Sequence, residues 1–104
     1  MPFENHGNRP FNAISVDKNA PAASGVYGLS NGREWIYVGE SANIHAELRK
    51  QLQSPNQALR EHTASGFTYE LSASEQRIER QSQLVRELRP IGNRMHAQAA
   101  RSRS

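Results

Sequence analysis

The sequence predicts an α+β domain in which a small three-stranded antiparallel sheet is flanked by three helices. Two observations predict the sheet. Two strand-like strings joined by an Asn-Gly turn form a hairpin over 25–39, and 67–71 alternates as a third strand. A third observation predicts the helices, because apolar residues recur at helical spacing after the hairpin and after the third strand. The order strand, strand, helix, helix, strand, helix favours this fold class.

The hairpin consists of two near-mirrored strings of three residues. The first reads Gly-Val-Tyr at 25–27, and the second reads Tyr-Val-Gly at 37–39. Between them, Asn-Gly at 31–32 supplies the positive φ angles that a tight hairpin turn needs. Folding about this turn pairs the two strands and brings Tyr27 and Tyr37 towards the same patch.

The helix after the hairpin is expected to begin at Ser41 or Asn43. Either side chain can accept a hydrogen bond from an unpaired backbone N–H group of the first turn. Ile44, Leu48 and Leu52 recur every four residues, as the buried stripe of an amphipathic helix does. The sequence therefore predicts one face of this helix against the sheet.

Two further helices are expected on either side of the third strand. Ser54, followed by a proline, is typical of a helix start and predicts a short helix over 55–62. Ser72 and Glu75 have the spacing of a capping box, in which each side chain bonds the other residue's backbone N–H. They predict the start of the last helix, which we expect to end at about Leu88.

We expect one domain over 24–93 with a segment on either side. A chain of 104 residues can bury one modest core. Residues 1–23 are interpreted as an N-terminal segment, partly flexible, in which 11–16 alternates as a short strand would. Residues 94–104 contain three arginines, no acid and no periodic apolar residues, and are predicted to be a basic disordered tail.

The net charge of +3 belongs to the predicted tail. The chain has 13 basic and 10 acidic residues, and the three arginines beyond residue 93 leave ten of each in 1–93. A neutral body argues against a phosphate-binding surface unless folding gathers the cations on one face. The chain has no cysteine, no apolar signal segment and no run approaching the ~20 apolar residues of a membrane span. We therefore expect a cytoplasmic protein without a membrane partner.

The hairpin resembles that of the GIY-YIG nuclease family, with valine in place of isoleucine at both central positions. The resemblance covers about 24–93 and implies the same α+β fold. It also implies that Tyr27 and Tyr37 stand at the two tyrosine positions of the family's catalytic site. Gly25 and Gly39 would then be the small residues that let the backbone and a substrate approach closely.

The resemblance further implies phosphodiester cleavage that uses an arginine on the first long helix and a Mg²⁺-binding glutamate on the last. Glu47 stands at the arginine position and Gln81 at the glutamate position. An anion at Glu47 should repel the scissile phosphate, and a neutral amide is a weak ligand for a hard cation. We therefore expect an impaired site without a cofactor, or Mg²⁺ or Mn²⁺ if the site is active. Gln81 is interpreted either as the floor of a pocket or as an amide bonded to backbone.

Other residues are candidates for ligand binding. Asn93 matches the asparagine that closes a Pro-x-x-Asn string in the family. Lys50 lies one turn after Glu47 and could bring a cation to the site. Arg77 and Arg80 on the last helix could contact phosphates, although ion pairs with acids of the same helix are the alternative.

Three functions remain open. The favoured one is a GIY-YIG-like pseudoenzyme that acts as a nucleic-acid-binding or interaction module, with DNA, RNA or protein as its partner. The second is an active metal-dependent endonuclease with a rewired site, in which Glu40 holds the metal and Lys50 supplies the cation. The third is a protein-interaction domain with no role in nucleic-acid binding, which the neutral body suggests.

Overall fold

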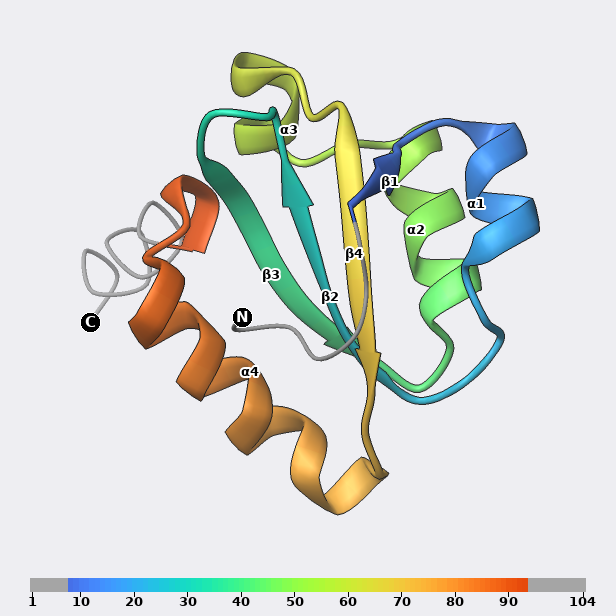
Figure 1. Cartoon of the computed structure of the whole chain (residues 1–104), viewed down its shortest axis with the longest axis vertical. Helices are drawn as coiled ribbons and strands as arrows, with labels where there is room; N and C mark the ends of the chain where they lie inside the picture. The colour runs from blue at the N-terminus through green and yellow to red at the C-terminus, as the bar shows by residue number, and fades with distance from the viewer. Residues whose placement is uncertain (1–7, 94–104) are drawn as a thin grey trace.

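The computed structural model describes residues 8–93, in which a four-stranded antiparallel sheet lies between two helical layers (Figure 1). The strands are β1 (Arg9–Pro10), β2 (Gly25–Ser30), β3 (Trp35–Ser41) and β4 (Gly66–Leu71), and the helices are α1 (Ala13–Asn19), α2 (Ile44–Gln53), α3 (Gln57–His62) and α4 (Ser74–Leu88). The chain is helical again at 91–93. The strand order across the sheet is β1-β4-β2-β3.

The predicted hairpin is confirmed as the pair β2 and β3. Gly32 has a φ of 86°, the left-handed value that the turn requires of its glycine. The side chain of Asn31 accepts hydrogen bonds from the backbone amides of 33–34, both at 3.0 Å. This turn sets a register in which Tyr27 lies directly opposite Gly39.

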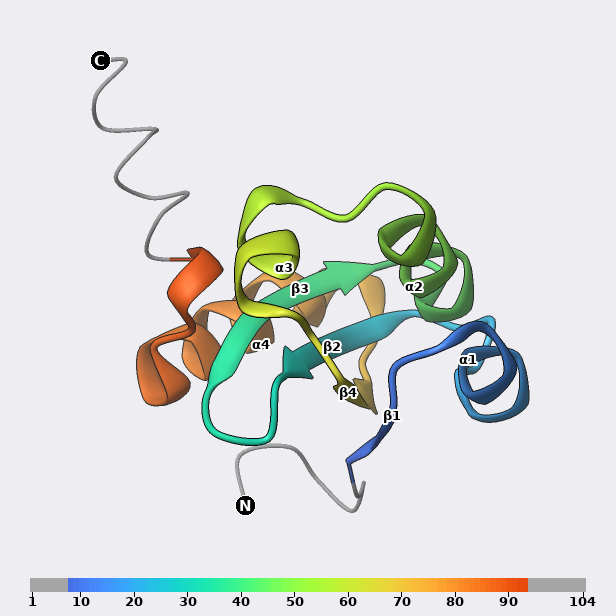
Figure 2. The same ribbon diagram turned by 90° about the horizontal axis from the view of Figure 1, so that it is seen from above.

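The central strand β2 is buried on both faces of the sheet. Because successive side chains of a strand point to opposite faces, Tyr27 and Val26 belong to different cores. The larger core lies under α1, α2 and α3 and includes Tyr27, Leu29, Phe67, Ile44 and Leu48. The smaller core lies under α4 and consists of Val26, Val38 and Leu84. Figure 2 shows α2 and α3 on the side of the sheet away from α4.

The expected strand over 11–16 is wrong, because this segment forms most of α1. The side chain of Asn12 caps the helix by accepting a hydrogen bond from the backbone amide of Ser15 at 2.9 Å. Ile14 and Val16, two residues apart, point in different directions around a helix, so Ile14 is 83% exposed while Val16 is buried. The polar residue Asn12 is the cap of the helix, and Val16 lies on its buried face, so the alternation of polar and apolar residues does not reflect a strand.

The predicted α+β class with an antiparallel sheet is confirmed, but the predicted counts of three strands and three helices are wrong for the described part of the chain. The strand β1 adds a fourth strand, since Arg9 and Pro10 pair with Phe67 and Gly66 of β4. A two-residue strand shows no alternation, and its proline is tolerated because β1 forms an edge. The helix α1 and the turn at 91–93 raise the number of helices. Residues 1–7 and the predicted tail over 94–104 lie outside the described residues.

The helix starts were predicted with mixed success. Asn43 caps α2 as expected, and its side chain accepts from the amide of Ala46 at 2.9 Å. The helix α3 is capped by Asn56 and not by Ser54, where the sequence predicted its start. The predicted capping box at the start of α4 is absent, because the first helical residue is Ser74 and its cap has no side-chain bond. The backbone carbonyl of Ser72 instead accepts a hydrogen bond from the hydroxyl of Ser24 at 2.6 Å.

Asn93 fastens the last described turn to the outer strand β3. Its side-chain oxygen accepts from the Val38 amide at 2.8 Å, and its side-chain nitrogen donates to the Val38 carbonyl at 2.9 Å. Gly92 makes this approach possible, since a Cβ there would meet the Ile36 carbonyl oxygen at 2.8 Å. Among residues 8–93, no helix is long and apolar enough to cross a membrane.

The role of Asn93 predicts a loss of stability on substitution. Asn93→Ala removes both bonds to Val38 and leaves its amide and carbonyl groups with fewer partners, so the free energy of unfolding should fall by about 1–3 kcal/mol. Urea denaturation followed by circular dichroism measures the change. Gln76→Ala, at an exposed position of α4, is the control and should leave the stability nearly unchanged. Equal stability of both variants would contradict this role.

Candidate functional site

The two tyrosines of the hairpin converge on one face of the sheet. The ring centroids of Tyr27 and Tyr37 are 6.3 Å apart, and the rings are tilted by 43°. Tyr27 is only 2% exposed, and a Cβ at Gly39 would collide with its ring. Gly39 therefore makes room for the ring of Tyr27 on the neighbouring strand.

Glu47 of α2 faces the tyrosines. Its carboxylate accepts a hydrogen bond from the Tyr27 hydroxyl at 3.2 Å and another from the side-chain amide of Gln51 at 3.3 Å. Gln51 follows Glu47 by one helical turn, which places both on the same face of α2. The sequence reasoning missed Gln51, although its spacing from Glu47 could have indicated it. The side-chain oxygen of Gln51 is buried and has no hydrogen-bond partner among the described residues.

The surroundings of both phenols favour the protonated form. Burial raises the pKa of Tyr27, and the nearby negative charge of Glu47 and the proximity of Tyr37 raise it further. Burial also raises the pKa of Tyr37, with added contributions from the charges of Glu47 and Glu40. A general base needs a pKa near the working pH. Neither phenol therefore has the acidity that would let it accept a proton as phenolate near neutral pH.

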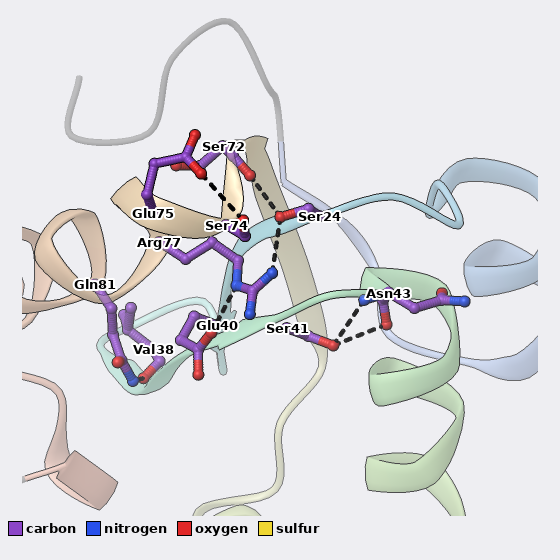
Figure 3. A network of polar contacts seen from close by, with 10 residues as sticks. All are labelled: Ser24, Val38, Glu40, Ser41, Asn43, Ser72, Ser74, Glu75, Arg77 and Gln81. Carbon is purple, nitrogen blue, oxygen red and sulfur yellow. Dashed lines mark hydrogen bonds and ion pairs between the residues drawn. The ribbon is translucent and has the colours of Figure 1, made fainter.

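Gln81 lies on the other face of the sheet, beside an ion pair (Figure 3). Its side-chain amide donates to the Val38 carbonyl at 3.2 Å, so the interpretation as an amide bonded to backbone fits its position. One turn earlier on α4, the guanidinium of Arg77 donates to Glu40 at 2.7 Å and to the hydroxyl of Ser24 at 3.0 Å. Glu40, the metal ligand of the rewired site that the sequence left open, is therefore held by Arg77.

Arg80 makes the second ion pair between α4 and the sheet. Its guanidinium donates to both oxygens of Glu70 on β4, at 2.7 and 2.9 Å. Glu70 and Arg80 line a groove of about 280 Å³ between the end of β4 and α4. The sequence offered phosphate or acids of the same helix as partners of Arg77 and Arg80. In the fold, both guanidinium groups bind acids of the sheet.

The remaining candidate residues are spread over the domain. Lys50 is exposed on α2, one turn beyond Glu47. Asn93 holds β3, as described above. A Cβ at Gly25 would collide with the Glu70 carbonyl oxygen, so Gly25 permits close packing of β2 against β4. The structure thus brings together Tyr27, Tyr37 and Glu47 on one face of the sheet, and Glu40, Arg77 and Gln81 on the other, while Lys50 stays at the surface.

The donors near the tyrosines do not suit a magnesium ion. Within residues 8–93, no group of three or more acidic, histidine or cysteine side chains could hold a metal ion. Mg²⁺ favours carboxylate oxygens and gives up its water reluctantly. The Glu47 carboxylate already accepts hydrogen bonds from Tyr27 and Gln51. On the other face, Gln81 supplies only a neutral amide, and Glu40 already binds Arg77. The residues present therefore do not fit the metal that the sequence resemblance implies.

The architecture is similar to that of the GIY-YIG N-terminal endonuclease domain of UvrC from Thermotoga maritima. The structure of that domain bound to its catalytic magnesium matches with a TM-score of 0.62 and 23% identity, covering 74% of this chain and 93% of that chain. A point mutant of the same domain, bound to its catalytic divalent cation, matches with a TM-score of 0.62 and 22% identity over 74% and 93% of the two chains. No protein-family model and no curated protein sequence matches this chain. The sheet, the paired tyrosines and these similarities together show that the chain has the fold of a GIY-YIG endonuclease domain.

Proposed function

We propose that this chain is a GIY-YIG-fold domain that binds a ligand without cleaving it. The hydrogen bond between Tyr27 and Glu47 is the observation that carries the proposal. A phenol that acted as a base would have to be deprotonated, but the Tyr27 hydroxyl donates its proton to a carboxylate. A carboxylate stabilises the protonated phenol and opposes the phenolate.

The charge of Glu47 also opposes phosphate chemistry at the tyrosines. Negative charge accumulates on a phosphodiester during attack, and enzymes stabilise it with cations or donated hydrogen bonds. Two like unit charges about 4 Å apart near a protein surface repel each other by about 4 kcal/mol. A phosphate beside Tyr27 would meet Glu47 in place of a cation.

The alternative of a rewired endonuclease receives no support from the contacts at Glu40. That mechanism needs the Glu40 carboxylate as a metal ligand and a cation from Lys50. Glu40 is bound to Arg77, and Lys50 lies exposed on another helix. We therefore do not propose metal-dependent cleavage.

Nucleic acid is the ligand class that we propose, because the solved structures with this fold are endonuclease domains. Binding would use exposed cations, since Arg77 and Arg80 are neutralised by acids of the sheet. Lys50 is the exposed cation nearest in sequence to Glu47, and Arg86 and Arg89 are exposed at the end of α4 and just after it. A protein ligand is the alternative that the binding experiment distinguishes.

We predict that the protein does not cleave DNA. The purified protein should leave supercoiled plasmid intact in the presence of Mg²⁺ or Mn²⁺, because the site lacks a base and a cation. Gel electrophoresis of the plasmid measures nicking, and the Thermotoga maritima domain is the positive control. Nicking that needs the metal and disappears in Tyr37→Phe would overturn the proposal, since a contaminating nuclease would not depend on Tyr37.

We also predict that Glu47 controls the ionisation of the tyrosines. Glu47→Gln removes a negative charge that raises the pKa of Tyr27 and of Tyr37, so the pKa of both phenols should fall. Tyrosinate absorbance during an alkaline titration measures the shift. Glu87→Gln, which removes an exposed acid of α4, is the matched control and should leave the titration unchanged. Identical curves for the two variants would mean that Glu47 does not control the phenols.

We further predict that residues 1–93 bind nucleic acid without the tail. A variant that lacks residues 94–104 should bind DNA weakly, with an affinity that falls steeply as salt rises. Lys50→Gln should reduce the slope of the logarithm of affinity against that of salt by about one, as expected for one lost phosphate contact. Fluorescence anisotropy of a labelled duplex measures both effects.

Arg33→Gln in the hairpin turn removes an equal charge and should leave that slope unchanged. An affinity that disappears with the tail, or that does not depend on salt, would instead favour a protein-interaction domain.

A further inference from the structure

We propose that the guanidinium of Arg77 takes the electrostatic place of a divalent cation, neutralising Glu40 and keeping metal ions out of this site. The solved structures with this fold hold a catalytic divalent cation. In this chain, Gln81 bonds the Val38 carbonyl of β3, and Glu40, two residues along the same strand, is bound by Arg77. The inference deepens the proposed function and rests on it, because it explains why the fold would lack its metal.

The contacts of Arg77 fix its guanidinium between two elements (Figure 3). Its Nε donates to Glu40 of β3 at 2.7 Å, and its Nη1 donates to the Ser24 hydroxyl at 3.0 Å. Ser24 is held in turn, since its hydroxyl donates to the Ser72 carbonyl. The side chains of Arg77 and Glu40 are 19% and 29% exposed, so solvent weakens this pair less than a fully exposed one. The Arg77 guanidinium is therefore held in place by contacts within the fold.

Arg77 and Gln81 of α4 contact neighbouring positions of β3. Arg77 and Gln81 are four residues apart on α4 and face the sheet together. Their partners on β3, Glu40 and the backbone of Val38, are two residues apart and thus lie on the same face of the strand. The guanidinium of Arg77 thus lies between α4 and β3, bound to the Glu40 carboxylate and the Ser24 hydroxyl, one helical turn before Gln81. Arg77 contributes a cation there without a metal ion.

The same geometry would exclude a metal ion. A divalent cation that approached Glu40 would be repelled by the guanidinium already bound there, and the single carboxylate could not neutralise both. Restoring a carboxylate by Gln81→Glu would not suffice, because an acid at 81 lies four residues from Arg77 and would pair with it. Metal binding should therefore require both the new carboxylate and the removal of Arg77.

Arg80 provides a matched control for this experiment. It lies on the same helix and binds its acid at the same distance of 2.7 Å, but its partner is Glu70 of β4. The double variants Arg77→Gln with Gln81→Glu, and Arg80→Gln with Gln81→Glu, have the same net charge. Each has lost one ion pair between α4 and the sheet. They differ in whether Glu40 is released.

The experiment measures Mn²⁺ binding to the full chain by electron paramagnetic resonance of the free ion. The variant with Arg77→Gln and Gln81→Glu should bind one Mn²⁺ at least about tenfold more tightly than the variant with Arg80→Gln and Gln81→Glu, a difference of about 1.4 kcal/mol. The unmodified protein should bind no more tightly than the Arg80 variant. Line broadening of the Glu40 amide in a nuclear magnetic resonance spectrum should locate the ion.

Equal affinities of the two double variants, including no binding by either, would overturn the inference. Tight Mn²⁺ binding by the unmodified protein would do the same. Circular dichroism verifies that both variants fold. If Arg77→Gln prevents folding, Arg77→Met is used in its place, because methionine preserves the apolar part of the side chain. The outcome is independent of the cleavage assay, since plasmid nicking by the unmodified protein would refute the proposed function whichever variant binds Mn²⁺.

Discussion

The buried phenol of Tyr27 is the contact on which the rest of the site depends. Its ring fills the space that Gly39 leaves on the neighbouring strand, and its hydroxyl reaches across to Glu47 of α2. A buried hydroxyl needs a hydrogen-bond partner, and here the partner is an acid. This interaction joins α2 to the sheet and, together with the burial of the ring, favours the protonated phenol. A structural requirement of the fold and the chemistry of the site are therefore satisfied by the same pair of atoms.

Two ion pairs join the last helix to the sheet. Arg77 binds Glu40 and Arg80 binds Glu70, so the two arginines attach α4 to two different strands. A fork of donors that meets both oxygens of a carboxylate, as at Glu70, fixes orientation as well as distance. The consequence is that Arg77 and Arg80 of α4 are held by acids of the sheet.

The two faces of the sheet have different roles. One face carries the large core and the cluster formed by Tyr27, Tyr37 and Glu47. The other carries the small core, the pair formed by Arg77 and Glu40, and the amides that bind Val38. Since β3 is an edge strand, its backbone needs partners on its outer side, and Asn93 and Gln81 provide them. Arg77, Gln81 and Asn93 are thus engaged in contacts that hold the domain together.

The sequence by itself determined the hairpin, the starting point of α2, the strand β4 and the presence of a long last helix. These features rest on local signals, namely the Asn-Gly turn, a capping asparagine and short-range periodicity. The family resemblance placed Glu47 at the arginine position of the first long helix, and the contact with Tyr27 appears only in the fold. Only the tertiary structure decided the strand β1, the helix α1 and the partners of Arg77 and Gln81. The physical reason is distance along the chain: a two-residue strand has no periodicity, and Glu40 lies 37 residues from the arginine that binds it.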